Sequence, residues 1–391
     1  MSEEIHEYLV PDYFPGFQCK IGACRHSCCE GWAISVTMPD YFKLLGLPCS
    51  AELRRRIDIA LHLYDYPTQE KYAQISPRYD GNCGMRLPDG RCGLQAELGE
   101  EALSEVCRLY PRGIRTDGGY EASCANSCEA VLERLIHHAA PMEFIRIPLT
   151  LKAPPAGERK IFFETFGREW QIRHYFIRLM QTRSQTLPVR LLILRQALAE
   201  VQKAMNDKDE DGLLKILRQT PEANIKENDM DKYASDLHYG LKVAEEMLAE
   251  IRARSRSVHD YGEAALRWFG TEAEALDQYN LARSRFEALL PNWEIAFEQM
   301  LVNHIFFERF PFQDRPMDLE DEFLGFAALY TLLRFLCFGW LAEHPSEAAF
   351  IDLCAATFRF ISHTSFDVYA SDLLKRLGCT ELRQVAGLLQ L

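Results

Sequence analysis

The sequence predicts a mostly α-helical protein in two parts. A small, irregular, cysteine-rich domain with a few short strands is expected over residues 1–140, and an all-α domain over residues 141–391. Ten of the thirteen cysteines precede residue 129, whereas the later part shows apolar residues at the three- and four-residue steps of helices. A stretch rich in proline over residues 139–158 separates these two patterns, which is why we place the boundary there.

The overall composition limits the possible partners. Hydrophobic residues make up 48% and charged residues 26% of the chain, as in a folded globular protein. The net charge of −13 argues against nucleic acid as a partner, because binding to phosphates requires a basic face. The first residues, Met1-Ser2-Glu3-Glu4, are acidic and lack the apolar segment of a signal peptide, so we expect a cytoplasmic protein.

Residues 323–342 are as apolar and as long as a membrane span, with Arg334 as their single charge. A charge in the middle of a span is costly in a membrane. Acidic residues, among them Asp318 and Glu320, precede the stretch, where the helix dipole favours anions. We therefore interpret this stretch as a buried helix of a helical domain and expect no membrane insertion.

In the first part, the elements follow from local patterns. Residues 1–18 contain many aromatic residues and prolines and are expected to form an extended arm that packs on the cysteine region. A short strand is expected over residues 32–38. Helices are expected over residues 39–47, 94–109 and 129–138. Cys124 and Cys128 are four residues apart, so they would share one face if the last of these helices had already begun there.

Beyond residue 158 the pattern is helical throughout. Phe162, Phe166 and Trp170 follow one another at four-residue steps, and this period continues to Met180. Polar stretches over residues 219–232 and 254–262 are expected to connect helices. The other helices are expected over residues 191–205, 213–218, 234–252, 263–269, 271–289, 293–309, 318–342, 346–362 and 364–377.

The cysteines of the first part indicate a metal site. Thiols stay reduced in the cytosol, and the adjacent Cys28 and Cys29 are poorly placed for a disulfide with each other, since their Cα atoms are only about 3.8 Å apart. Thiolates select zinc, copper(I) or iron–sulfur clusters. The paired Cys-x2-Cys segments of zinc sites are absent, and the candidate thiols are too many for one tetrahedral ion, so an iron–sulfur cluster gains weight while zinc remains open. The candidate ligands are Cys19, Cys24, Cys28, Cys29, Cys83, Cys92, Cys107 and Cys128.

Within this set, Cys24, Cys28 and Cys29 are expected to share one centre, because thiols so close in sequence converge with little loop-closure cost. The later members of the set would supply a further ligand or a second site. Four cysteines are expected to be dispensable: Cys49, Cys337, Cys354 and Cys379. The glycine-rich signatures of nucleotide-binding folds are absent from the chain, so those folds are disfavoured.

Several motifs together carry a resemblance to a known family. In the first part they are Phe17-x-Cys19-x-Ile21-Gly22-x-x-Cys24-x-x-x-Cys28-Cys29-x-Gly31-Trp32, Leu98-Gly99-Glu100, Cys107-Arg108-Leu109-Tyr110-Pro111-Arg112 and Ser127-Cys128-Glu129. In the second part they are residues 301–312 and, more loosely, residues 358–363. With these motifs the chain resembles the flagellin lysine-N-methylases over nearly its whole length. Its cysteine half also resembles a broader group of zinc- or iron-chelating proteins.

The resemblance implies methyl transfer from S-adenosylmethionine to lysine side chains of flagellin, with a [4Fe–4S] cluster on the cysteine half. Family members often have proline where Glu129 follows the last motif cysteine, and Cys124 looks like an addition, so the fourth cluster ligand stays open. The role of the cluster is also open: it could hold the amino-acid part of the donor, support radical chemistry or stabilise the domain. The segment Cys24-x3-Cys28-Cys29 does not have the cysteine spacing that is usual in radical enzymes.

Methyl transfer to lysine requires a neutral amine, whose pKa in water is near 10.4. Desolvation or a general base would remove the proton. The candidate catalytic residues are the polar side chains of the two C-terminal motifs, although each has an equally good reading as a core, capping or solvated group. They are Asn303, His304, Glu308, Arg309 and His363. The alternative hypothesis is a non-catalytic iron- or zinc-binding module whose helical domain docks a partner.

Overall fold

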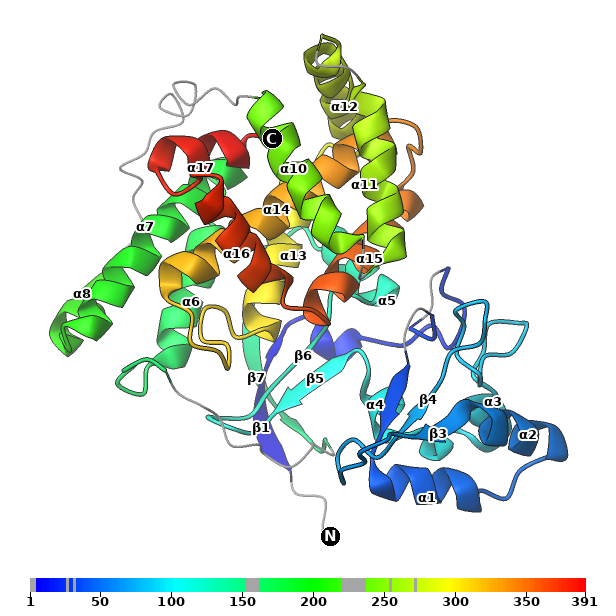
Figure 1. Ribbon diagram of the computed structural model, residues 1–391. Helices are drawn as coiled ribbons and strands as arrows, with labels where there is room; N and C mark the ends of the chain where they lie inside the picture. The colour runs from blue at the N-terminus through cyan, green and yellow to red at the C-terminus, as the bar shows by residue number, and fades with distance from the viewer. Residues whose placement is uncertain are drawn as a thin grey trace. The chain divides into compact units, whose positions relative to one another are not determined.

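The computed structural model describes residues 5–391, except residues 26–27, 31–32, 152–161, 220–236, 253–254 and 271–272. The chain forms two compact units, both drawn in Figure 1. The cysteine unit comprises residues 13–113 and 128–130. The helical unit comprises residues 1–12, 114–127 and 131–391.

A four-stranded sheet, in the order β5-β6-β1-β7, explains why these units differ from the expected boundary at residue 140. Its strands are β1 (His6–Pro11), β5 (Arg112–Arg115), β6 (Glu121–Cys124) and β7 (Phe144–Leu149). Strand β1 pairs with β7 in antiparallel and with β6 in parallel orientation. The expected arm over residues 1–18 is therefore wrong in part, because Tyr8, Leu9 and Val10 are buried in an interior strand.

The cysteine unit is built on a three-stranded antiparallel sheet, in the order β2-β4-β3. The strand expected over residues 32–38 and the helix expected over residues 39–47 are confirmed as β2 and α1. The helix expected over residues 94–109 is broken at Gly99, whose φ of 83° ends α3. The elements are η1 (Phe14–Gly16), β2 (Ile34–Val36), α1 (Met38–Gly46), α2 (Ala51–Ala60), β3 (Leu61–Leu63), β4 (Ala73–Ile75), α3 (Gly93–Leu98), η2 (Glu100–Ala102) and α4 (Glu105–Leu109).

Helices form most of the helical unit, so the predicted fold class, mostly α with a few short strands, is confirmed. Helix α5 (Glu129–Ile136) leads into this unit. The others described are α6 (Glu169–Met180), α7 (Leu187–Asn206), α8 (Glu210–Arg218), α10 (Leu237–Ile251), α11 (Arg256–Phe269), α12 (Ala275–Leu289), α13 (Trp293–Phe307), α14 (Leu319–Leu341), α15 (Glu347–Ser362), α16 (Phe366–Arg376) and α17 (Leu382–Leu389).

Three details of the helical expectation are wrong. Residues 256–262, expected as a connector, belong to α11, because the buried Val258 continues its apolar face. Residues 162–168 are not helical, since Phe166 and Gly167 have positive φ angles. Cys124 ends a strand and Cys128 precedes α5, so they do not share a helix face. The connector expected over residues 219–232 lies almost wholly outside the described residues.

Helix α14 lies at the centre of the helical unit and packs against α7, α11, α12, α15, α16 and α17 (Figure 1). Among the described residues it alone is long and apolar enough to cross a membrane, yet 94% of its most apolar window is buried. Asp318 caps its first turn by accepting from the Asp321 N–H. Its buried charge, Arg334, donates to the Leu389 carbonyl at 2.8 Å. These contacts are those of a core helix.

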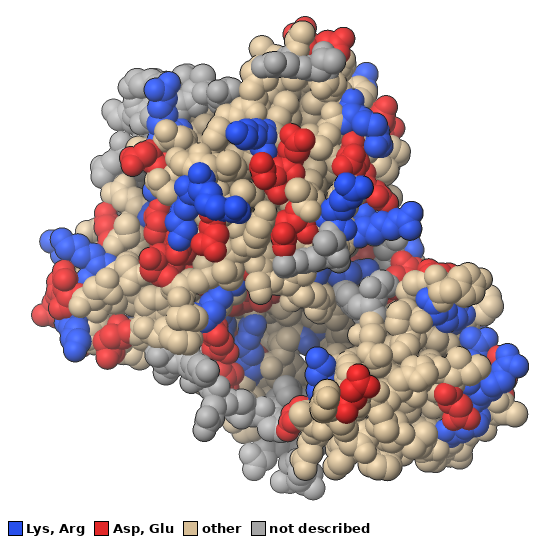
Figure 2. Space-filling model, in the orientation of Figure 1, with Lys and Arg blue, Asp and Glu red and all other residues tan. Residues whose placement is uncertain are grey.

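The surface of the helical unit carries charges of both signs. On the face drawn in Figure 2, acidic and basic side chains are interspersed over this unit. Within this unit, some opposite charges form pairs one helical turn apart, such as Arg283 with Glu287 at 2.8 Å.

Helix α13 is buried along nearly its whole length, so its polar side chains need partners inside the helical unit. Glu298 is fully buried and accepts from Arg190 at 2.6 Å and from Arg183 at 2.9 Å. These ion pairs join α13 to α7 and to the segment before α7. Removing the carboxylate would leave Arg190, which is also buried, with only the more distant Glu294 at 3.8 Å as an acidic partner.

We expect Glu298→Gln to lower the free energy of unfolding by about 3 kcal/mol, because it breaks a buried ion pair. Urea denaturation followed by circular dichroism measures this change. The matched control is Glu287→Gln, which removes an exposed pair and should change the free energy by no more than about 0.5 kcal/mol. Equal effects of the two substitutions would contradict the importance of the buried pair.

Candidate functional sites

Two glycine turns bring distant cysteine segments together in the cysteine unit. Gly22 and Gly90 both have a φ of 88°, and a Cβ added to Gly22 would lie 2.7 Å from the Gly90 carbonyl oxygen. Only glycine permits this backbone approach. The Cys83 N–H also donates to the Cys29 carbonyl at 2.6 Å. The first cysteine segment is therefore held against the loop that carries Cys83.

Five thiols gather there: Cys28, Cys29, Cys83, Cys92 and Cys107. The sulfur atoms of Cys28 and Cys29 are 4.0 Å apart, and the Cys29 thiol also hydrogen-bonds that of Cys83. Cys92 and Cys107 lie close enough for their charges to act on Cys29 and on each other. A backbone amide supports one of the sulfurs, since the Met85 N–H donates to Cys83 at 3.4 Å. Cys92 is the N-cap residue of α3.

The proximity of these thiols opposes their ionisation. The hydrogen bond with Cys29, followed by burial, raises the pKa values of Cys28 and Cys83 far above the ordinary value. Burial raises the pKa of Cys107 to about 12 and also raises that of Cys92. A bound cation would reverse this effect, because it stabilises thiolates that otherwise repel one another.

Cys24 belongs to a second group, with Cys19 and Cys128. Burial and the charges of Glu129, Cys128 and Cys19 raise the pKa of Cys24 to about 12. Glu129 is buried and accepts from Lys20 at 2.7 Å and from the Arg25 N–H at 2.8 Å. Burial opposes its charge, but these donors hold its pKa below the usual value. Cys19 acts electrostatically on Cys24 and also on Cys28 of the first group.

The sulfur donors fit a soft metal in number and chemistry. The separation of 4.0 Å between the Cys28 and Cys29 sulfurs is near the value of about 3.8 Å for two thiolates on one tetrahedral ion. Among the described residues, no three His, Cys, Asp or Glu side chains already have metal-binding geometry. A metal site with three or more of these thiols as ligands would therefore require them to move closer together.

The remaining cysteines lie elsewhere. Cys49 packs against the core of the cysteine unit. Cys124, Cys337, Cys354 and Cys379 are fully buried in the helical unit, where Cys354 hydrogen-bonds Cys337. All thirteen cysteines are described, and each is a free thiol.

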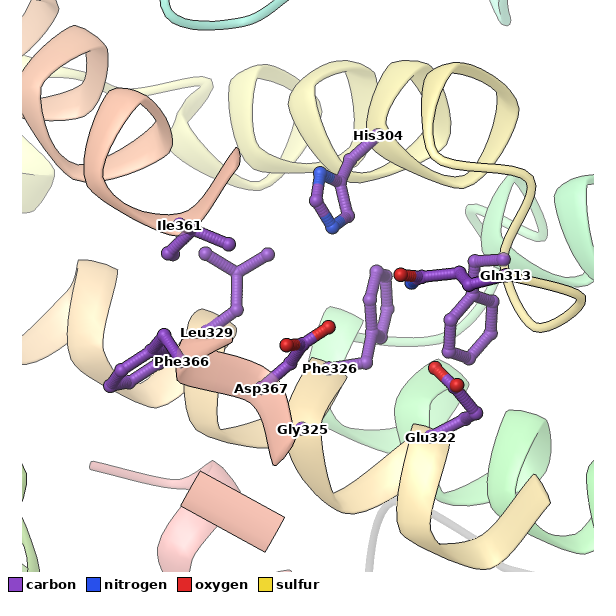
Figure 3. Close-up of a pocket in the computed structure, with 10 residues that line it drawn as sticks. His304, Gln313, Glu322, Gly325, Phe326, Leu329, Ile361, Phe366 and Asp367 are labelled. Carbon is purple, nitrogen blue, oxygen red and sulfur yellow. The ribbon is translucent and has the colours of Figure 1, made fainter. Parts of the chain in front are cut away.

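A polar pocket in the helical unit lies between α13, α14 and the start of α16 (Figure 3). Its walls include the rings of Phe310 and Phe326, the Gln313 amide, and the carboxylates of Glu322 and Asp367. The free volume at its centre is about 10 Å³, close to the size of one water molecule. The pocket therefore has room for one small polar group.

His304 is the titratable group that extends into this pocket from α13 (Figure 3). It is 92% buried, and neither ring nitrogen has a hydrogen-bond partner among the described residues. Burial lowers its pKa, although the charges of Glu308 and Asp367 act in the opposite direction. The imidazole is therefore neutral at pH 7 and able to accept a proton.

Arg315 balances the two carboxylates of the pocket. It donates to both oxygens of Glu322 at 2.8 Å and forms an ion pair with Asp367. Burial raises the pKa of Glu322 despite these hydrogen bonds. Gly325 lets α16 approach, since a Cβ there would lie 2.9 Å from the Asp367 carbonyl oxygen. None of these pocket residues was among the predicted catalytic candidates. For Glu322, for example, the sequence shows only an acidic residue in the first turn of a helix.

The other candidate catalytic residues lie outside the pocket lining. Asn303 is fully buried and donates to the Cys124 carbonyl at 2.8 Å and to Asn126 at 2.6 Å, so it joins α13 to the end of β6. Glu308 accepts from the Ser362 hydroxyl at 3.1 Å. His363 follows α15, and burial lowers its pKa. Arg309 follows the end of α13 and pairs with Asp117.

Comparison with known proteins identifies the helical part. Residues 173–388 match the model of the FliB lysine N-methylase C-terminal domain. The flagellar biosynthetic protein FliU of Salmonella muenchen is 28% identical over 173 residues, which are 43% of this chain and 90% of FliU. No solved structure matches the chain.

Two relatives named lysine-N-methylase are similar over a shorter region. The protein of Salmonella choleraesuis is 30% identical over 132 residues, and that of Salmonella typhimurium is 29% identical over 133 residues. In both comparisons the match covers 32% of this chain and 32% of the relative. The family model, in contrast, covers more than half of the 391 residues. The chain therefore belongs to the FliB lysine N-methylase family.

Proposed function

We propose that this protein transfers methyl groups from S-adenosylmethionine to lysine side chains of flagellin in the cytoplasm. The match to the lysine N-methylase model over residues 173–388 carries the proposal. The flagellar name of the relative FliU favours a flagellar substrate. We further propose that the cysteine unit holds a [4Fe–4S] cluster.

The pocket around His304 has the chemistry to receive the nitrogen of the target lysine. Its central volume is that of one small polar group, and the faces of aromatic rings attract cations. The carboxylates of Asp367 and Glu322 add negative charge, part of which Arg315 compensates. An ammonium group would be the favoured occupant of such a site, and it must lose a proton before it reacts.

His304 would accept that proton. A neutral imidazole without a hydrogen-bond partner is available as a general base. The lysine nitrogen then attacks the methyl carbon of the donor, a new N–C bond forms, and the C–S bond breaks with its electrons left on sulfur. The sulfonium becomes a neutral thioether, and the proton on His304 returns to solvent.

The [4Fe–4S] cluster would be held by four of the five gathered thiols, and such a cluster supplies a redox-active iron centre when bound. Cys28, Cys29 and Cys83 are the first three ligands we assign, because the thiols of Cys28 and Cys83 both hydrogen-bond that of Cys29. Cys92 or Cys107 would complete the set. A zinc ion on the same thiols is the alternative, favoured by the 4.0 Å sulfur separation.

Incubation of the protein with flagellin and a labelled methyl donor tests the activity. We expect label on lysine side chains, located by mass spectrometry, under reducing and oxygen-free conditions. An equal amount of a lysine-rich protein unrelated to flagella serves as the specificity control. Absence of lysine label with a metal-loaded, folded protein would refute the proposed activity.

We expect His304→Gln to lower kcat/KM about 100-fold, because general-base assistance is lost. Since burial lowers the pKa of His304, the wild-type rate should fall only below about pH 6.5. This acid limb should be absent from the residual activity of the variant. His363→Gln is the matched control, since burial also lowers the pKa of His363 outside the pocket. An unchanged acid limb in His304→Gln would exclude His304 as the base.

The metal content of single Cys→Ser variants tests the ligand assignment. Replacing Cys28, Cys29 or Cys83 should remove most of the bound metal per chain, because each loss leaves an incomplete ligand set. Cys49→Ser is the control and should retain it. Iron with a visible absorption bleached by dithionite supports the cluster, whereas colourless protein with stoichiometric zinc supports the alternative. Full metal content in the Cys28 and Cys29 variants would overturn the assignment.

A further inference from the structure

The pocket around His304 has apolar walls next to the imidazole ring. Phe326 and Leu329 extend toward this ring from α14, and Ile361 of α15 lies beside Leu329 (Figure 3). All three side chains are buried, with exposed fractions of 3%, 2% and 6%. Carbon atoms therefore form much of the surface that a group beside His304 would touch.

The packing behind these walls is tight. The Phe326 ring stacks on the buried Phe310 ring, with the two ring centroids 4.8 Å apart. At Gly325 the backbones of α14 and α16 approach each other, since an added Cβ would lie 2.9 Å from the Asp367 carbonyl oxygen. Close-packed interiors yield little, and each extra methylene forces neighbouring side chains or the backbone to shift. The walls therefore set a narrow limit on the size of the group beside His304.

The free space itself is small. Its volume of about 10 Å³ corresponds to one group of the size of a water molecule. The nitrogen of a primary amine would fill this space. A methyl group on that nitrogen adds a carbon atom, for which the walls leave no further room. The pocket is thus shaped to distinguish a primary amine from an amine that already carries methyl groups.

We propose that Leu329, with Phe326 beside it, limits the reaction to one methyl group per lysine. This inference rests on the proposed function and assigns to these two residues the choice of its product. A neutral amine directs its electron pair at the methyl donor, so its two remaining substituents face the pocket walls. In lysine both substituents are hydrogen atoms. In monomethyl-lysine one is a carbon atom, and a second transfer would press it against Leu329 and Phe326.

Mass spectrometry of flagellin after long incubation with excess methyl donor tests the assignment, because it counts the methyl groups on each lysine. The wild-type protein should yield monomethyl-lysine. Leu329→Ala removes three carbon atoms beside His304 and should raise the ratio of dimethyl- to monomethyl-lysine at least about tenfold. Phe326→Leu should change the ratio in the same direction. The melting temperature and circular dichroism verify that each variant is folded.

Leu336→Ala is the matched control. Leu336 is also buried in α14, but it lies two turns beyond Leu329, about 10 Å along the helix, and does not line the pocket. Its substitution removes the same three carbon atoms and should leave the product ratio unchanged. Dimethyl- or trimethyl-lysine as the main wild-type product would overturn the inference. So would an unchanged ratio in folded Leu329→Ala and Phe326→Leu, or an equal rise in Leu336→Ala.

Titration with butylamine and N,N-dimethylbutylamine, followed by calorimetry, separates this inference from the proposed function, because it requires no methyl transfer. The wild-type protein should bind the dimethyl amine at least about tenfold more weakly than the primary amine, and Leu329→Ala should reduce this difference. That pattern without any lysine methylation would support the size limit and refute the activity. Lysine dimethylation by the wild-type protein would refute the size limit and support the activity. Equal affinities for the two amines, or binding of neither, would overturn the inference.

Discussion

The burial of α13 is the constraint on which the helical unit depends. Water does not reach most of this helix, so each polar side chain on it requires a partner from a neighbouring element. Glu298 forms ion pairs with two arginines. Gln299 donates to the Ala140 and His138 carbonyls, and Asn303 donates to the carbonyl at the end of β6. These hydrogen bonds fix the helix to the sheet and to α7. They also fix the side chains at its C-terminal end.

Near the C-terminal end of α13, two side chains a few residues apart lie in different surroundings. His304 extends into a pocket lined by aromatic rings and carboxylates, a setting suited to a cation that gives up a proton. Arg309, only five positions later, instead forms an ion pair with Asp117. These contacts give a physical reason for the polar residues within the apolar motif over residues 301–312.

In the cysteine unit, the backbone geometry of two turns brings the cysteine segments together. Gly22 and Gly90 permit two turns to touch, and the hydrogen bond from Cys83 to the Cys29 carbonyl sets the register between them. Five thiols then lie in partly apolar surroundings, where the hydrogen bond with Cys29 and burial raise the pKa values of Cys28 and Cys83. A soft cation that bound there would have to displace their protons.

The sequence by itself determined the helical class, the central buried α14, the cysteine-rich start and the family, since periodicity and motifs are local properties of the chain. It also marked Asn303, His304 and Arg309 as polar residues in an apolar motif. Only the tertiary structure decided that the first strand pairs with β6 and β7, and that Cys29 meets the loop that carries Cys83. These outcomes depend on contacts between residues far apart in the chain, which no local pattern encodes.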